Sequence, residues 1–225
     1  MIRKGGPLRN NQQLFIFDLD GTLIDSSRDL AISTNAMLRR FGRPEVDEHT
    51  VNTYVGDGAP TLVRRAIGDS ASEEEFQAAY RYFIAFYRDH SLENTRLYPG
   101  IREALDELRM AGSTLAVLTN KPVKLSRDIL AGLDAADYFF RIYGGDSFPA
   151  KKPDPVGVET LLRETSIQRE NATMVGDSDV DIQTARNAGV RSCGVSWGFK
   201  PESLGEPPAD LIVGDARQLV RALRS

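Results

Sequence analysis

The stretch "LFIFDLDGTLID", residues 14–25, decides how the rest of the chain is interpreted. Four apolar residues run directly into Asp18 and Asp20, which are separated by a single leucine. Aspartate is rare inside strands, so the apolar run predicts a short buried strand that ends just before Asp18. Residues two apart on an extended backbone project to the same side, which brings two like charges together. The pair either caps a turn, which Gly21 would allow, or holds a cation.

Short apolar runs and amphipathic helical stretches alternate along most of the chain. The apolar runs lie at residues 14–17, 113–120, 138–145, 172–177, 191–198 and 210–213. The helical stretches lie at residues 101–112, 123–133, 156–166, 181–189 and about 215–223. Strands that are separated by single helices need crossover connections, and these produce a parallel sheet covered on both faces. The sequence therefore predicts an α/β fold with a doubly wound, Rossmann-like parallel sheet.

Residues 26–96 break this alternation, because helical periodicity continues there without a convincing strand. An aromatic stripe in this region, which ends at Tyr87, is interpreted as core packing. We expect an all-helical domain at residues 26–96, inserted between two parts of an α/β core at 14–25 and 97–225. Residues 1–13 are basic and polar, and we expect them to form a flexible leader.

Composition and charge exclude several classes of protein. Hydrophobic residues make up 41% of the 225 residues and charged residues 27%, which is typical of a soluble globular protein. The net charge of −4 gives no general attraction to nucleic acid, and no apolar run approaches the roughly 18 residues of a membrane span. We expect a cytoplasmic protein, a monomer or a small homo-oligomer, that binds neither nucleic acid nor membranes.

Cysteine and histidine usage limits the chemistry further. Cys193 is the single cysteine, so an intramolecular disulfide is impossible, as suits a reducing compartment. The two histidines stand in no motif, and no pair of histidines or cysteines has the spacing of zinc ligands. Any metal must therefore have oxygen ligands, which points to magnesium-type chemistry.

Ligands of open parallel sheets bind beyond the carboxyl ends of the strands, near the point where strand order reverses. Four predicted strand ends carry polar residues, and these are Asp18 with Asp20, Thr119 with Asn120, Lys152, and Asp177 with Asp181. This convergence favours a single site. A carboxylate is a known nucleophile in phosphoryl transfer, and its attack on an anionic phosphate needs a metal and a cation nearby. Lys152 suits that role, and Lys151 is its competitor.

The segments "DLDGTLIDS", "LTN", "KKPDP" and "GDSDVD" resemble, in order, the four motifs of the haloacid dehalogenase superfamily, over about residues 14–220. This resemblance implies that Asp18 is the nucleophile and that Asp20 is the acid and base. It also implies that Thr119 and Lys152 hold the transferring phosphoryl group. Mg²⁺ would be bound by Asp18, by the backbone carbonyl of Asp20 and by Asp177, with Asp181 supporting the metal or its waters.

The inserted helices match a C1-type cap of that superfamily, which closes over the site and chooses the substrate. The resemblance implies a substrate loop at Gly56 and Gly58, and it assigns Gly21 and Asn120 to substrate binding as well. Arg65 either meets a substrate carboxylate or forms a salt bridge on the helix surface.

Softer features, such as "VGDGAPTLVRRAI" and "LAVLTNKP", are most similar to the phosphoglycolate phosphatases of this superfamily. The expected partner is thus a small phosphorylated metabolite. The alternatives are another small phosphate (a sugar phosphate, pyrophosphate or a nucleotide), a phosphoglucomutase-type transfer and, remotely, a non-catalytic binding module. A phosphonatase would need a lysine in the cap, and residues 26–96 contain none.

Overall fold

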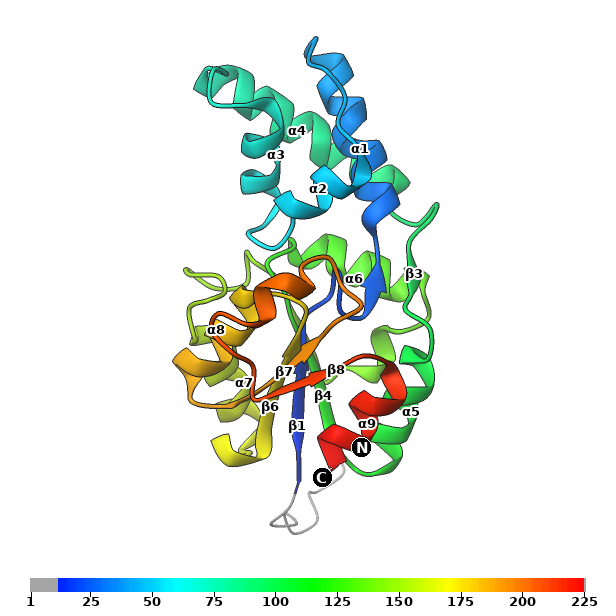
Figure 1. Cartoon of the computed structure of the whole chain (residues 1–225), viewed down its shortest axis with the longest axis vertical. Helices are drawn as coiled ribbons and strands as arrows, with labels where there is room; N and C mark the ends of the chain where they lie inside the picture. Colours follow the sequence, from blue (N-terminus) through cyan, green and yellow to red (C-terminus); the bar gives the residue numbers. More distant parts are fainter. Residues whose placement is uncertain (1–11, 225) are drawn as a thin grey trace, which may run out of the picture.

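A six-stranded sheet forms the centre of the protein in the computed structural model, which describes residues 12–224 (Figure 1). Its strands are β1 (Leu14–Phe17), β4 (Thr114–Leu118), β5 (Arg141–Tyr143), β6 (Ala172–Gly176), β7 (Arg191–Val195) and β8 (Leu211–Val213). They lie in the order β5-β4-β1-β6-β7-β8, and each pairing is parallel. The predicted α/β fold with a doubly wound parallel sheet is confirmed.

Helices cover both faces of this sheet. They are α5 (Ile101–Met110), α6 (Val123–Gly132), α7 (Val156–Thr165), α8 (Asp179–Ala188) and α9 (Ala216–Arg224). The side chains of β1 alternate between two apolar clusters, as the period of two in a strand requires. Phe15 and Phe17 pack with residues of α5, α6 and α9, whereas Leu14 and Ile16 pack with residues of α7 and α8.

Strand order reverses at β1, which fixes where a ligand can bind. From β1 the chain passes to β4 and β5 on one side, and it then returns to β6 on the other side. The carboxyl end of β1 therefore lies at the crevice between the two halves of the sheet. Asp18, the first residue after β1, stands at this point.

A block of helices lies over that end of the sheet (Figure 1). It consists of α1 (Ser27–Arg40), α2 (Glu48–Tyr54), α3 (Ala59–Ile67) and α4 (Glu73–His90). Helix α2 was not predicted, because Val51 is its single buried residue and the segment has little apolar periodicity. Phe83 and Tyr87 of α4 belong to the same apolar cluster as Phe17, so the helical block packs on the core.

The chain enters and leaves the helical block through a short two-stranded ribbon. Strand β2 (Ile24–Asp25) pairs antiparallel with β3 (Arg96–Leu97), with Asp25 opposite Arg96. Strands of two residues are too short to give a periodic signal, and the sequence analysis did not predict them. The division into a core and an inserted cap at residues 26–96 stays a prediction.

Two expectations concern the chain outside the sheet. Residues 1–11 of the predicted leader lie outside the described residues, while Gln12 already contacts the core, where its side-chain amide donates to Thr114 Oγ1 at 2.9 Å. Across residues 12–224, no helix has both the length and the apolar character that crossing a membrane would require.

Candidate active site

Three buried carboxylates meet at the carboxyl ends of the central strands. Asp18 follows β1, Asp177 follows β6, and Asp181 lies in the first turn of α8. One carboxylate oxygen of each residue lies within 4.8 Å of the other two. Parallel strands bring their carboxyl ends to one edge of the sheet. Residues about 160 positions apart in the chain therefore become neighbours. The structure thus brings together three of the predicted site residues.

Lys152 is the cation of this cluster. Its Nζ lies 2.9 Å from Asp18 Oδ1 and 2.6 Å from Asp181 Oδ1, and the side chain is buried. Burial by itself would lower the pKa of Lys152, but the charges of Asp18 and Asp181 outweigh that effect and raise it. Lys151 points elsewhere and donates to the backbone oxygen of Asp57. Of the two lysines left open by the sequence, Lys152 is the one that contacts Asp18.

The cluster carries more negative charge than Lys152 neutralises. Burial, with a contribution from the charge of Asp181, raises the pKa of Asp18 to about 6, although Lys152 opposes the rise. Burial, together with Asp181 and Asp18, raises the pKa of Asp177 to about 8. Three carboxylates thus face one ammonium group. Burial disfavours their charged forms, and the carboxylates also repel one another. A hard divalent cation with oxygen ligands would relieve this repulsion, so these residues fit Mg²⁺.

Local hydrogen bonds fix the orientation of the acidic groups. Asp177 accepts from Thr22 Oγ1 at 3.3 Å and from the backbone N–H of Phe199 at 2.7 Å. Asp181 accepts from Ser178, from Oγ at 2.8 Å and from N–H at 3.2 Å, in a capping box at the start of α8. Because both oxygens of Asp181 already have protein partners, its geometry suits holding Lys152 in place.

The Asp20 carboxylate lies outside the three-carboxylate cluster. Lys121 Nζ lies 2.9 Å and 3.0 Å from the two Asp20 oxygens, and Ser26 Oγ donates to Asp20 Oδ1 at 2.5 Å. Lys121 Nζ also donates to the Tyr87 hydroxyl of α4 at 2.7 Å. Burial alone would lower the pKa of Lys121, but Asp20 and Tyr87 raise it overall, so the ammonium stays charged. Sequence reasoning missed Lys121, and its one signal was its position directly after "LTN".

Asn120 connects the core to the loop between α2 and α3. Its side-chain amide donates to the backbone oxygens of Gly56 at 2.9 Å and of Lys152 at 3.0 Å. Gly58 lies against the same residue, because a Cβ at this position would be 3.0 Å from the Asn120 carbonyl oxygen. The predicted substrate loop is therefore held directly over the end of β4.

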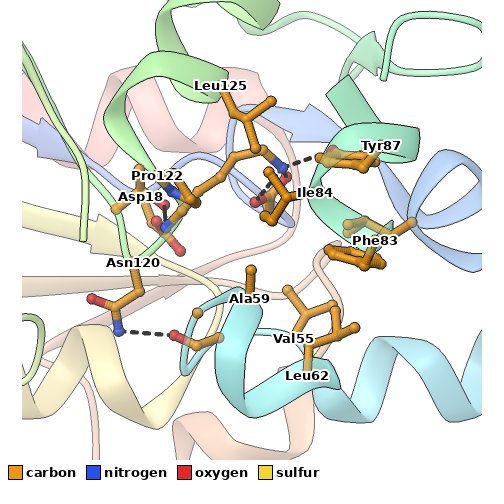
Figure 2. A pocket seen from close by; sticks show the side chains of 16 residues that line it. Asp18, Val55, Ala59, Leu62, Phe83, Ile84, Tyr87, Asn120, Pro122 and Leu125 are labelled. Carbon is orange, nitrogen blue, oxygen red and sulfur yellow. Dashed lines mark hydrogen bonds and ion pairs between the residues drawn. The ribbon is translucent and has the colours of Figure 1, made fainter. Parts of the chain in front are cut away.

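A pocket opens between Asp18 and the helical block (Figure 2). From the core it is lined by Asp18, Asp20, Thr119, Asn120, Lys121, Pro122 and Leu125. From the helical block it is lined by Leu30, Val55, Gly56, Gly58, Ala59, Leu62, Phe83, Ile84 and Tyr87. A smaller hollow beside Asp177 and Lys200 shares Asp18 and Asp20 with this pocket. Asp18, the candidate nucleophile, thus stands between this pocket and the cluster of Asp18, Asp177 and Asp181, which we call the metal-type cluster.

Arg65 does not line either hollow. Its guanidinium forms an ion pair with Asp57 Oδ2 at 2.7 Å, and 41% of its side chain is exposed. This contact corresponds to the second of the two interpretations given by the sequence, a salt bridge on the helix surface. The assignment of Arg65 to substrate binding stays a prediction.

Comparison with known proteins identifies the class to which this fold and site belong. The sequence model of the haloacid dehalogenase-like hydrolases matches residues 15–195, which is most of the chain. The chain therefore belongs to the haloacid dehalogenase-like hydrolase family.

Individual relatives are similar over 78% or more of their length. A phosphoglycolate phosphatase of Vibrio vulnificus (strain CMCP6) is 42% identical over 217 residues, which cover 92% of this chain and 94% of that protein. Phosphoglycolate phosphatase 1 of Pseudomonas aeruginosa is 37% identical and is covered to 78% of its length, with 92% of this chain. A crystal structure described as "a predicted phosphoglycolate phosphatase" from Haemophilus somnus 129PT superimposes with a TM-score of 0.89 at 32% identity. That alignment covers 96% of this chain and 99% of the Haemophilus chain.

Proposed function

We propose that this protein is a Mg²⁺-dependent phosphomonoester hydrolase that works through an aspartyl-phosphate on Asp18, with 2-phosphoglycolate as its preferred substrate. One observation carries the proposal. The Asp18 carboxylate is in contact with Lys152, lies beside Asp177 and lines a pocket that also contains Asp20. A nucleophile, a neutralising cation, a metal-type cluster and an acid are thus present around a single point.

Each residue has a part in a two-step displacement. A bound Mg²⁺, held by Asp18, Asp177 and the Asp20 carbonyl, would supply positive charge for the phosphoryl oxygens. An Asp18 oxygen attacks phosphorus, the phosphorus–oxygen ester bond breaks, and Asp20 gives its proton to the departing alkoxide. Asp20 then takes a proton from water, whose oxygen attacks phosphorus and releases inorganic phosphate and free Asp18. Lys152 and Thr119 hold the phosphoryl group during both steps.

The helical block gives this reaction its substrate preference. We assign residues 26–96 to a cap that covers the pocket, and the preference for 2-phosphoglycolate is supported by relatives that bear this activity in their names. The buried free thiol of Cys193 supports a place in the cytoplasm. For its oligomeric state we propose a monomer or a small homo-oligomer.

A substrate panel tests the proposal. We expect purified protein with Mg²⁺ to release phosphate from 2-phosphoglycolate with a kcat/KM at least about tenfold above that for sugar phosphates, nucleotides and pyrophosphate, since a pocket fitted to one leaving group discriminates by roughly this factor or more. Phosphate release is measured for each substrate over a range of concentrations. Preference for another member of the panel would contradict the substrate assignment, and failure to hydrolyse any member would contradict the reaction class.

Gly21 provides a local test of the metal-type cluster. Its φ is +80°, and a Cβ there would lie 2.2 Å from Asp177 Oδ2. Gly21→Ala should therefore strain the turn and push Asp177 out of place. We expect a loss of roughly 1–3 kcal/mol in the free energy of unfolding and about 10–100-fold lower activity at limiting Mg²⁺. Urea unfolding and a Mg²⁺ titration of the rate measure the two effects.

Gly112→Ala is the matched control for this substitution. Gly112 has a similar φ of +86°, but apart from Gly112 itself and its two chain neighbours no atom lies within 4 Å of the position that its Cβ would occupy. This variant should lose stability from backbone strain alone and keep the Mg²⁺ dependence of the unmodified protein. If both variants need the same Mg²⁺ concentration for half-maximal rate, the effect of Gly21→Ala does not come from a displaced Asp177.

A further inference from the structure

The proposed substrate carries two anionic groups, and the cluster around Asp18 accounts for one of them. In 2-phosphoglycolate a carboxylate is bonded to the carbon that bears the phosphate ester oxygen. When the phosphorus lies at Asp18, this carboxylate must enter the adjoining pocket. A buried carboxylate without a partner is strongly unfavourable, so a pocket that accepts it needs a cation or several donors.

The cap side of the pocket is mainly apolar. Val55, Leu62, Phe83 and Ile84 face the space beside Asp18 and have no side-chain donors (Figure 2). Among the residues that line this pocket in the described chain, the only cation is Lys121. A carboxylate placed here therefore has one cationic neighbour on the pocket wall, and this cation also pairs with Asp20.

Lys121 and Tyr87 both line this pocket, and their polar groups lie side by side. The Lys121 side chain is only 5% exposed, and its ammonium lies between the Asp20 carboxylate and the Tyr87 hydroxyl. Tyr87 accepts the hydrogen bond from Lys121, and its own hydroxyl hydrogen meets no acceptor within residues 12–224. A buried hydroxyl with an unused donor, next to an ammonium, is suited to a carboxylate, which has two oxygens to accept with.

We propose that Lys121 and Tyr87 form the receptor for the substrate carboxylate, so that the site selects phosphate esters that carry a carboxylate close to the ester oxygen. This inference rests on the proposed function and names the residues that set its specificity. Lys121 stands beside Asp20, the residue that protonates the ester oxygen, so the receptor lies next to the bond that breaks.

Other nearby cations have different neighbours. Lys152 contacts Asp18 and Asp181 on the metal side of the cluster. Lys200 lines the smaller hollow beside Asp177, and Arg65 is paired with Asp57. None of these three lines the apolar-walled pocket.

The test compares two substrates that differ only in this group. Ethyl phosphate has a methyl group where 2-phosphoglycolate has its carboxylate. The measured quantity is the ratio of kcat/KM for 2-phosphoglycolate to that for ethyl phosphate. Lys121→Met should lower this ratio roughly a hundredfold, as expected for the loss of a buried charge partner. Lys121→Met also leaves the Asp20 carboxylate unpaired, and this charge repels a carboxylate but not a methyl group. The Tyr87→Phe variant, which keeps the Lys121–Asp20 pair, is therefore read beside it.

Further variants separate the receptor from a general effect. Lys121→Arg keeps the charge and should retain most of the ratio, and Tyr87→Phe should lower it by roughly tenfold through the lost donor. Lys124→Met is the matched control, because Lys124 pairs with Asp128 on the exposed face of α6 and should leave the ratio unchanged. Lys200→Met and Arg65→Met test the two neighbouring cations as alternative receptors for the carboxylate.

Each outcome has a distinct meaning. A protein that hydrolyses other phosphates but shows no preference for 2-phosphoglycolate over ethyl phosphate would overturn both the substrate assignment and the receptor. A preference that survives in Lys121→Met, or that is lost in Lys200→Met or Arg65→Met instead, would overturn the receptor alone. If Lys121→Met is inactive, calorimetric binding of both esters to Asp18→Asn, with and without Lys121→Met, measures the preference as a ratio of dissociation constants.

Discussion

Replacing Asp18 by asparagine should lower the rate of phosphate release by about 10⁴-fold or more, because an amide cannot form the aspartyl-phosphate. The fold should survive, since asparagine has nearly the same shape and removes one of three crowded carboxylates. Burial raises the pKa of Asp18 to about 6, which means that its charged form is unfavourable in the folded protein. At neutral pH the variant should therefore be at least as stable as the unmodified protein in thermal unfolding.

An Asp→Asn change on the surface provides the comparison. Asp128 pairs with Lys124 on the exposed face of α6, away from the pocket. Asp128→Asn should have the activity of the unmodified protein. If Asp18→Asn keeps a near-normal rate while it remains folded, Asp18 is not the nucleophile.

Removal of divalent cations should also lower the rate of phosphate release. In EDTA the rate should fall below about one hundredth of its value with Mg²⁺, because Lys152 alone leaves the carboxylates and the incoming phosphate incompletely neutralised. Addition of excess Mg²⁺ should restore the rate. Mg²⁺ should also raise the thermal unfolding temperature of the metal-free protein, because a ligand that binds only the folded state stabilises it.

Asp177→Asn tests whether this Mg²⁺ acts at the cluster. The variant should need at least about tenfold more Mg²⁺ for half-maximal activity, and it should lose most of the thermal stabilisation by Mg²⁺. A sodium salt of matched ionic strength controls for screening. Undiminished turnover in EDTA, or an unaltered Mg²⁺ response in Asp177→Asn, would contradict the metal site.

The parallel sheet could be predicted because each strand is a short apolar run and each crossover is an amphipathic helix. Leu14–Phe17 is buried on both faces, and this leaves an unmistakable pattern in the sequence. Helix α2 leaves no such pattern, because Val51 is its single buried residue. The ribbon of Ile24–Asp25 and Arg96–Leu97 depends on contacts between residues about 70 positions apart. A local periodicity in the sequence does not predict such contacts.

Some residues of the site could likewise be predicted from the sequence, and others could not. Asp18, Lys152 and Asp177 stand in dense polar motifs at strand ends, so their meeting could be predicted from the topology. Lys121 is a single lysine in a segment that gives no sign of burial, and lysine is most often a solvated surface residue. Tyr87 was predicted to pack in the core and is indeed buried, but its hydrogen bond to Lys121 depends on how α4 lies against the loop that follows β4. When a side chain both packs in the core and contacts a ligand, the apolar periodicity of the sequence indicates only the packing.

The ribbon between β2 and β3 has a consequence for how such a protein can change over evolutionary time. Asp25 lies opposite Arg96, so everything between these two residues begins and ends at one place. A segment whose ends already touch can be lengthened, shortened or exchanged without moving the strands outside it. Asp18 and its metal-type cluster would keep their geometry through such an exchange. Such an exchange would replace Tyr87 and the apolar side of the pocket, while Lys121 and the carboxylates would stay with the sheet.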